Sequence, residues 1–158
     1  MSKILVVYQS FGGKTKSLAE AAAAGAVSAG AEAAVKEVSA VSPEDFASIS
    51  GVILATTQPF QSMAGGMKSM FERLWIGRDK VKKGIPFAII ICHMNDTKPT
   101  EEGIKAIASH LGLGQLAGEL NVKVDEIEAG KESAKQLGIA LAQGGYNTGL
   151  KQLKAKGR

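Results

Sequence analysis

The amino-acid sequence predicts a doubly wound α/β domain in which five parallel strands, in the order 2-1-3-4-5, are covered by helices on both faces. Stretches with strand and helix character alternate along the chain, which is typical of consecutive βαβ units. The first, third and fourth predicted strands are apolar throughout, as strands are when both faces of a parallel sheet are covered. Right-handed crossovers leave few topologies, and this order places a ligand site at the carboxyl ends of strands one and three.

Five short runs are predicted to be strands because they are rich in apolar or β-branched residues and lie between turn residues. They cover residues 3–8, 33–38, 51–57, 86–92 and 116–122. The first is Lys3-Ile4-Leu5-Val6-Val7-Tyr8, and the second follows the turn glycine Gly30.

Four stretches are predicted to be helices, at residues 15–29, 64–75, 101–111 and 131–142. The first is dense in Ala, Leu and Glu, which favour helix, and the third ends at Gly112. Ser42-Pro43-Glu44-Asp45 predicts a short helical turn, because Pro suits the first helical position after a Ser cap. Residues 1–143 are therefore expected to form one domain, and residues 144–158 a basic C-terminal tail.

Composition is that of an ordinary globular protein, with 45% hydrophobic and 22% charged residues in a chain of 158. No apolar run is long enough to span a bilayer, and the apolar start is too short for a secretory signal. The single cysteine, Cys92, excludes an internal disulfide. We therefore expect a cytoplasmic protein without membrane insertion.

The net charge of +4 does not by itself indicate nucleic-acid binding. The excess lies mainly at residues 78–83 and in the tail, and neither patch is interleaved with aromatic residues. Solvated surface is the expectation for both.

Residues Tyr8 to Thr15 form a hydroxyl- and glycine-rich loop between the first strand and the first helix. Such a loop opens a helix N-terminus, where backbone N–H groups and the helix dipole favour an anion. Gly12 and Gly13 allow close approach of a ligand, and Ser10 and Thr15 add hydroxyls. The loop therefore suits a phosphate group, although a plain turn with Thr15 as helix cap would use the same residues.

Several other motifs fail on spacing. A P-loop needs a glycine where Tyr8 stands, and a dinucleotide fingerprint needs more than the pair Gly12 and Gly13. His93 and His110 lie in different elements without Cys or carboxylate at metal spacing, so no metal site is expected. A nucleophile elbow and the carboxylates of a phosphorylated receiver domain are also missing from the sequence.

The segment from Ser10 to Thr15 resembles the Ser/Thr-x-x-Gly-x-Thr phosphate loop of flavodoxin-like proteins. In that family this first loop (residues 9–15) holds the phosphate of FMN. The resemblance implies that Ser10, Gly13 and Thr15 bind the phosphate here. It also implies backbone contacts from Phe11, Gly12 and Lys14.

The segment from Thr56 to Arg73 resembles the pattern in flavodoxin-fold reductases of the quinone oxidoreductase (WrbA-like) type. There, a Pro-aromatic-x-Ser-Met segment borders the flavin ring. The resemblance implies a second loop (residues 57–63) in which Gln58, Pro59, Phe60 and Gln61 edge the isoalloxazine. Thr57, at the start of this loop, is expected to bind the cofactor too. Many members of this family have Pro-Thr-aromatic or Pro-x-aromatic spacing with a Tyr or Trp near the ring. Here Pro59 directly precedes Phe60, which can stack but cannot donate a hydrogen bond.

The third loop (residues 92–99) lacks the glycine-rich or acidic aromatic segment of many relatives. Asn95 and Asp96 are expected to hydrogen-bond the pyrimidine edge of the flavin. His93 either faces a substrate as a catalytic residue or is a hydrogen-bonded loop histidine. Cys92 borders the same site at the end of a buried strand and is expected to be a packing thiol.

The resemblance implies a flavodoxin-like three-layer fold and an FMN-dependent redox protein. One option is an NAD(P)H-dependent oxidoreductase acting on quinones or similar small acceptors. Another is a flavodoxin-type electron carrier that serves a redox partner protein. A non-redox relative that has lost FMN, and a homo-oligomer, also stay open.

Charge favours the reductase. The three loops contain one acidic residue, Asp96, against Lys14 and Lys98. Local positive charge should stabilise an anionic reduced flavin and so favour two-electron transfer.

Overall fold

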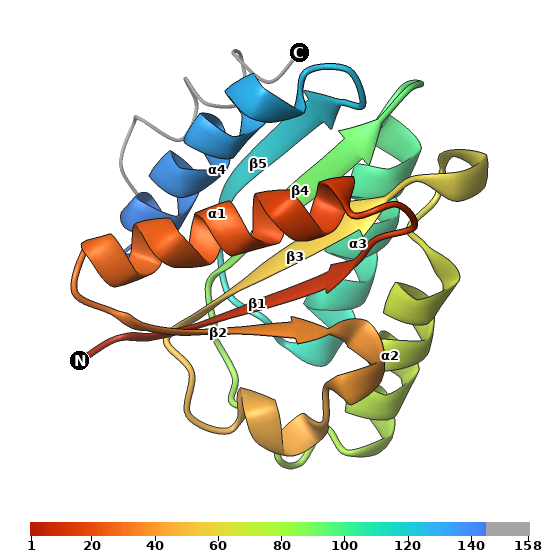
Figure 1. The fold of residues 1–158 in the computed structure, drawn as a ribbon. Coiled ribbons are helices and arrows are strands. Elements are labelled where there is room, and N and C mark those ends of the chain that lie inside the picture. The colour runs from red at the N-terminus through yellow and green to blue at the C-terminus, as the bar shows by residue number, and fades with distance from the viewer. Residues whose placement is uncertain (145–158) are drawn as a thin grey trace.

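Five parallel strands form a central sheet in the order β2-β1-β3-β4-β5 in the computed structural model (Figure 1). The structure describes residues 1–144, and the predicted basic tail lies outside the described residues apart from Gly144. The strands are β1 (Lys3–Gln9), β2 (Glu32–Glu37), β3 (Gly51–Thr57), β4 (Phe87–His93) and β5 (Leu116–Lys123). The predicted fold class and strand order are confirmed.

Four α-helices connect the strands: α1 (Lys14–Ser28), α2 (Gly65–Ile76), α3 (Lys98–Leu111) and α4 (Ile127–Ala142). The predicted start of α3, at residue 101, was three residues too late, since the helix begins at Lys98. Pro99 lies in the first turn, where a backbone N–H has no partner within the helix, so the missing N–H of proline is tolerated there. The predicted start of α4 was four residues too late, and this helix has no side-chain cap to mark its first turn. None of the described helices has the length and apolar character needed to cross a membrane.

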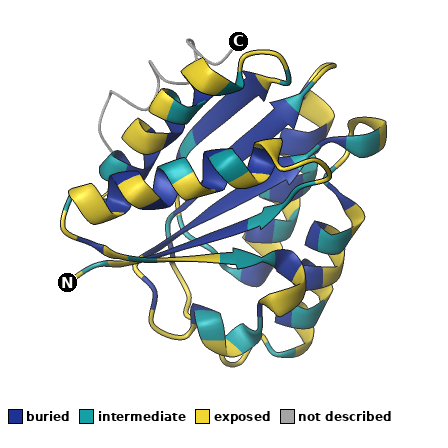
Figure 2. Ribbon diagram, viewed as in Figure 1, coloured by how far each residue is buried: buried dark blue, intermediate teal, exposed yellow. Residues whose placement is uncertain are grey.

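The helices form two layers with the sheet between them (Figure 1). Helices α1 and α4 cover one face, while α2 and α3 cover the other. Successive strand residues point to opposite faces, so Ile53 packs toward α1 and α4 whereas Leu54 packs toward α2 and α3. The strands are accordingly buried almost throughout, apart from the edge strand β2 (Figure 2).

Helices α1 and α4 are in backbone contact. A Cβ at Gly25 of α1 would overlap the carbonyl oxygen of Lys135, and a Cβ at Gly138 of α4 would overlap that of Ala22. Glycine at both positions is therefore what lets the two helices approach so closely.

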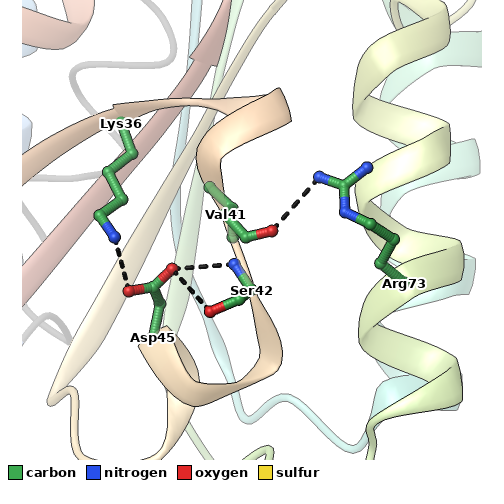
Figure 3. A network of polar contacts seen from close by, with 5 residues as sticks. All are labelled: Lys36, Val41, Ser42, Asp45 and Arg73. Carbon is green, nitrogen blue, oxygen red and sulfur yellow. Dashed lines mark hydrogen bonds and ion pairs between the residues drawn. The ribbon is translucent and has the colours of Figure 1, made fainter.

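Two short 3₁₀ turns, η1 (Val38–Ala40) and η2 (Pro43–Phe46), replace a full helix between β2 and β3. The second confirms the helical turn predicted from Ser42-Pro43. Arg73 of α2 donates to the carbonyl oxygens of Val38 and Val41, which ties this connection to the helix layer. Figure 3 shows the bond to Val41.

Asp45 anchors the start of η2. Its carboxylate accepts from the backbone N–H of Ser42 at 2.8 Å and pairs with Lys36 Nζ at 2.7 Å (Figure 3). Partial burial tends to raise the pKa of this carboxyl, but the bonds from Lys36 and Ser42 outweigh it and hold the pKa below the ordinary value of 3.8.

Replacing Asp45 with Asn is expected to lower the free energy of unfolding by about 1 kcal/mol at neutral pH, since it removes the ion pair with Lys36 and the negative charge of the group that accepts from Ser42. A carboxyl with a lowered folded-state pKa contributes stability above its unfolded-state value of 3.8 and loses it as the pH falls. Urea unfolding at pH 7 and pH 3 should therefore show the gap between wild type and variant closing at the lower pH. A gap that is equal at both values would contradict this account.

Candidate functional site

Three loops meet at the carboxyl edge of the sheet, after β1, β3 and β4 (Figure 1). They enclose a shallow cavity of about 250 Å³, here called the first cavity. Residues predicted from the sequence that line it are Ser10, Phe11, Gly12, Lys14, Thr15, Thr57, Gln58, Pro59, Cys92 and Asn95. Met94 and Val124 also line it, and sequence reasoning missed both.

The first loop is shaped to present backbone N–H groups. Gly13 adopts φ 95°, a conformation that glycine accepts without strain, directly before the first turn of α1. Its N–H donates to Ser10 Oγ at 2.9 Å, so this hydroxyl holds the loop as well as bordering the cavity. The N–H groups of Lys14, Thr15 and Lys16 have no backbone acceptor within residues 1–144, as expected at a helix start.

Thr15 presents a buried hydroxyl at this helix start. The residue is fully buried, yet Oγ1 makes no hydrogen bond to any described residue. Thr57 Oγ1, at the end of β3, also borders the cavity and is likewise buried without a partner among residues 1–144. Because buried polar groups are nearly always hydrogen-bonded, two such hydroxyls in one cavity wall fit an oxygen-rich ligand.

Cys92 lies against the same wall and is 4% exposed. Burial raises the pKa of its thiol, and the nearby Thr15 hydroxyl and Lys14 ammonium only partly offset this. The thiol is therefore neutral at pH 7, as expected of a packing residue, and a neutral thiol is too weak an acceptor to satisfy the Thr15 hydroxyl.

Lys14 closes the side of the first cavity that faces β5. Its Nζ donates to the carbonyl oxygen of Val124 at 2.8 Å, which ties the start of α1 to the connection between β5 and α4. The two residues are 110 positions apart, so no local signal in the sequence could have indicated the contact.

Gln58 joins the second loop to the third. Its Oε1 accepts from the N–H groups of Met94 and Asn95 at 3.2 and 2.9 Å, and its Nε2 donates to the carbonyl oxygen of Asp96 at 3.0 Å. The Gln58 amide is thus already hydrogen-bonded on both sides. Its side chain forms cavity wall and fixes the distance between two loops.

Phe60 and Gln61 form the tip of the second loop in left-handed backbone conformations, with φ of 56° and 57°. Neither residue lines the first cavity, and the Phe60 side chain is fully exposed. Phe11 and Met94 are also exposed apolar side chains beside the cavity. We call Phe11, Phe60 and Met94 the apolar rim, since each of the three loops contributes one of them.

His93 lies on the other side of the third loop. Cys92 packs toward α1 and α4, so its neighbour His93 points to the opposite face of the sheet. Its ring lines a second cavity of about 560 Å³ beside α3 and β5, and Asp96 lines this cavity too. Nδ1 contacts the Asn95 carbonyl oxygen at 3.0 Å, which requires a proton on Nδ1, and Nε2 is buried with no partner among the described residues.

The structure thus does not bring His93 or Asp96 to the first cavity. Asn95 is the residue of the third loop that lines both cavities. The alternation of side chains along β4 is a signal from which the position of His93 could have been predicted.

No family model matches the sequence. Among solved structures, a flavodoxin from the domain Archaea superposes with a TM-score of 0.72 at 19% identity, over 90% of this chain and 97% of that one. A flavodoxin, WrbA-like protein from Agrobacterium tumefaciens superposes with a TM-score of 0.72 at 18% identity, over 98% and 100%. An azoreductase from Bacillus anthracis gives 0.68 at 9% identity, over 88% and 99%. The chain therefore has the flavodoxin-like fold.

Proposed function

We propose that the protein binds FMN without a covalent bond in the first cavity and uses it for redox chemistry. The observation that carries this proposal is the buried, unpartnered Thr15 hydroxyl at the N-terminus of α1. A phosphate dianion there would accept from Thr15 Oγ1 and from the N–H groups of the first turn. No acidic residue lies in that turn to repel it.

The apolar rim supports a site for the flavin ring. Phe11 and Met94 border the cavity next to Pro59, and Phe60 stands at the tip of the second loop. Exposed aromatic and thioether side chains beside a cavity are suited to contact a flat aromatic ring. FMN, when bound, supplies the ring that takes up a hydride or single electrons, and the protein orients that ring and sets its charge environment.

Charge supports a reductase that takes electrons from NAD(P)H and passes them to a quinone or a similar small acceptor. Of the described residues that line the first cavity, Lys14 is charged and none is acidic. Positive charge stabilises an anionic reduced ring, which favours two-electron transfer. Two structural neighbours, a WrbA-like flavodoxin and an azoreductase, agree with this option.

His93 stays a candidate catalytic residue only for a substrate that reaches the second cavity, since its ring lies there. For a substrate stacked above the first cavity, Asn95 is the better placed polar side chain of the third loop. The single buried thiol, Cys92, accords with a reducing compartment, and we propose the cytoplasm.

A flavodoxin-type electron carrier is the alternative function. The shallow first cavity and the fully exposed Phe60 favour it, because they leave a bound ring accessible to a partner protein without an enclosed substrate pocket.

Anaerobic addition of NADPH or NADH to the FMN-loaded protein separates the two functions. For a reductase we expect either nucleotide to bleach the flavin absorbance directly, and a quinone to restore it over repeated cycles. A flavin that is bleached by dithionite but by neither nucleotide would contradict the reductase and favour the carrier.

A further inference from the structure

The edge strand β5 is polar on the face that α3 covers. Its residues Leu120 and Val122 pack into the core beneath α1 and α4. The residues that alternate with them, and so point to the opposite face, are Glu119, Asn121 and Lys123. Glu119 and Asn121 are nevertheless buried, at 4% and 1% exposure. Asn121 and Lys123 line the second cavity, so this face of β5 gives the cavity a polar wall.

Asn121 has an acceptor oxygen without a donor. Its Nδ2 donates to Glu101 Oε1 at 2.8 Å, which fixes the orientation of the amide. Oδ1 is therefore the free acceptor, and it is buried without a hydrogen bond to any residue in 1–144. His93 Nε2 is a second buried acceptor of this kind, since the proton of its ring lies on Nδ1. Both residues line the second cavity, which therefore suits a ligand that donates hydrogen bonds.

Glu101, in the first turn of α3, brings a buried carboxylate to the same cavity. It is 5% exposed, and it accepts from Asn121 and from Thr97 Oγ1, which are both neutral groups. Lys105, one turn later on α3, pairs with Glu119 and not with Glu101. Glu101 has no ion pair within the described part of the chain, although buried carboxylates usually have a cationic partner. The start of α3 compensates its charge only in part.

The charges around the second cavity leave one negative charge in excess. The charged residues that line it are Lys98, Lys105, Lys123, Asp96, Glu101 and Glu102. Glu119, the partner of Lys105, adds a fourth carboxylate against the three lysines. Lys123 is exposed to solvent, whereas Glu101 is buried. The interior of the cavity therefore favours a cation.

We propose that the second cavity binds a small organic molecule through a primary ammonium group. Such a group carries one positive charge and three N–H donors, and it has no acceptor. It therefore matches a buried carboxylate without a cation and two buried acceptors without donors. Residues 1–144 contain no group of three His, Cys, Asp or Glu side chains suited to a metal, which favours an organic cation over a metal ion. The proposal does not depend on FMN binding in the first cavity.

Titration of the full chain with n-butylammonium, followed by NMR of the imidazole nitrogens and side-chain amides, tests this site. We expect saturable shifts of His93 Nε2 and of the Asn121 amide. His110 is the internal control, because it is the other histidine of the chain and lies exposed on α3 outside the second cavity. Its nitrogens should not shift.

Matched ligands separate the ammonium group from charge and from hydrogen bonding alone. n-Butyltrimethylammonium has the same charge without an N–H, and n-butanol has a donor without the charge. Each should bind at least tenfold more weakly than n-butylammonium, because neither can form charge-assisted hydrogen bonds with the acceptors of the cavity.

Two substitutions test the residues. Glu101→Gln keeps the shape and removes the charge, and Asn121→Leu removes the free acceptor. Each should weaken n-butylammonium binding at least tenfold. Glu72→Gln and Thr100→Val are the controls, since one removes an exposed carboxylate from α2 and the other a buried hydroxyl from α3, and neither residue lines the second cavity. Both should leave the affinity unchanged, and circular dichroism should show folded protein in each case.

Three results would overturn the proposal. One is a wild type in which His93 shows no saturable shift with n-butylammonium. The second is equal affinity for n-butylammonium and n-butyltrimethylammonium, which would show that charge alone attracts the ligand. The third is n-butylammonium binding that survives Glu101→Gln; this variant decides the matter if Asn121→Leu does not fold. None of these results bears on FMN, so a failure here and a failure of the proposed function are distinguishable.

Discussion

Replacing Gly138 with alanine is expected to lower the free energy of unfolding by about 2–3 kcal/mol, because the new methyl group would overlap the carbonyl oxygen of Ala22 in α1. The contact is with backbone, so no side-chain rotation can relieve it, and α4 must move away from α1. That movement would open the core layer packed beneath both helices. Urea or thermal unfolding followed by circular dichroism measures the loss.

Gly103 provides the matched control for Gly138. It also lies inside a helix, α3, but a Cβ there would meet only Met63 Cε at 3.5 Å, an ordinary van der Waals contact. Gly103→Ala should therefore raise the free energy of unfolding by about 0.5–1 kcal/mol, as alanine does for glycine in a helix. The same substitution is thus expected to have opposite signs at the two positions. Equal effects would show that helix propensity, and not the α1–α4 contact, decides the stability at Gly138.

Replacing Thr15 with valine is expected to weaken FMN binding by about 10- to 100-fold, since a hydrogen bond to a charged phosphate is worth about 1.5–3 kcal/mol. Valine keeps the shape of threonine, and the hydroxyl has no partner among the described residues, so stability should hardly change. Riboflavin lacks the phosphate, and its affinity should be nearly the same in variant and wild type. Flavin fluorescence titrations with the two ligands measure both effects.

Thr100→Val is the control for this experiment. Thr100 is also fully buried with an unpartnered hydroxyl in the first turn of a helix, but it does not line the first cavity. It should alter neither affinity. If Thr15→Val weakens FMN and riboflavin equally, Thr15 acts on the shape of the site and not on the phosphate.

The fold could be predicted from the sequence because its signals are local and repeat along the chain. Alternating strands and helices, together with apolar central strands such as Val52 to Ala55, determine a covered parallel sheet. The first loop was predictable for the same reason. Its glycines and hydroxyls are adjacent in sequence, and the helix start that they open is determined by the next few residues.

The second and third loops were less predictable because contacts between distant residues determine their shape. Gln58 uses both the oxygen and the nitrogen of its amide on the backbone of the third loop, which nothing near Gln58 in the sequence indicates. Phe60 has a left-handed backbone without the glycine or asparagine that usually marks one, and its side chain is fully exposed. The start of α3 was mispredicted for a local reason. A proline such as Pro99 fits both the end of a loop and the first turn of a helix, so it does not tell the two apart.

The central claim is that the first cavity is a site for FMN, and titration of FMN fluorescence with the flavin-free protein tests it most directly. We predict saturable quenching at one FMN per chain, with riboflavin binding at least tenfold more weakly because it lacks the phosphate that the start of α1 would bind. FMN fluorescence that stays unchanged on addition of excess folded protein would contradict the claim.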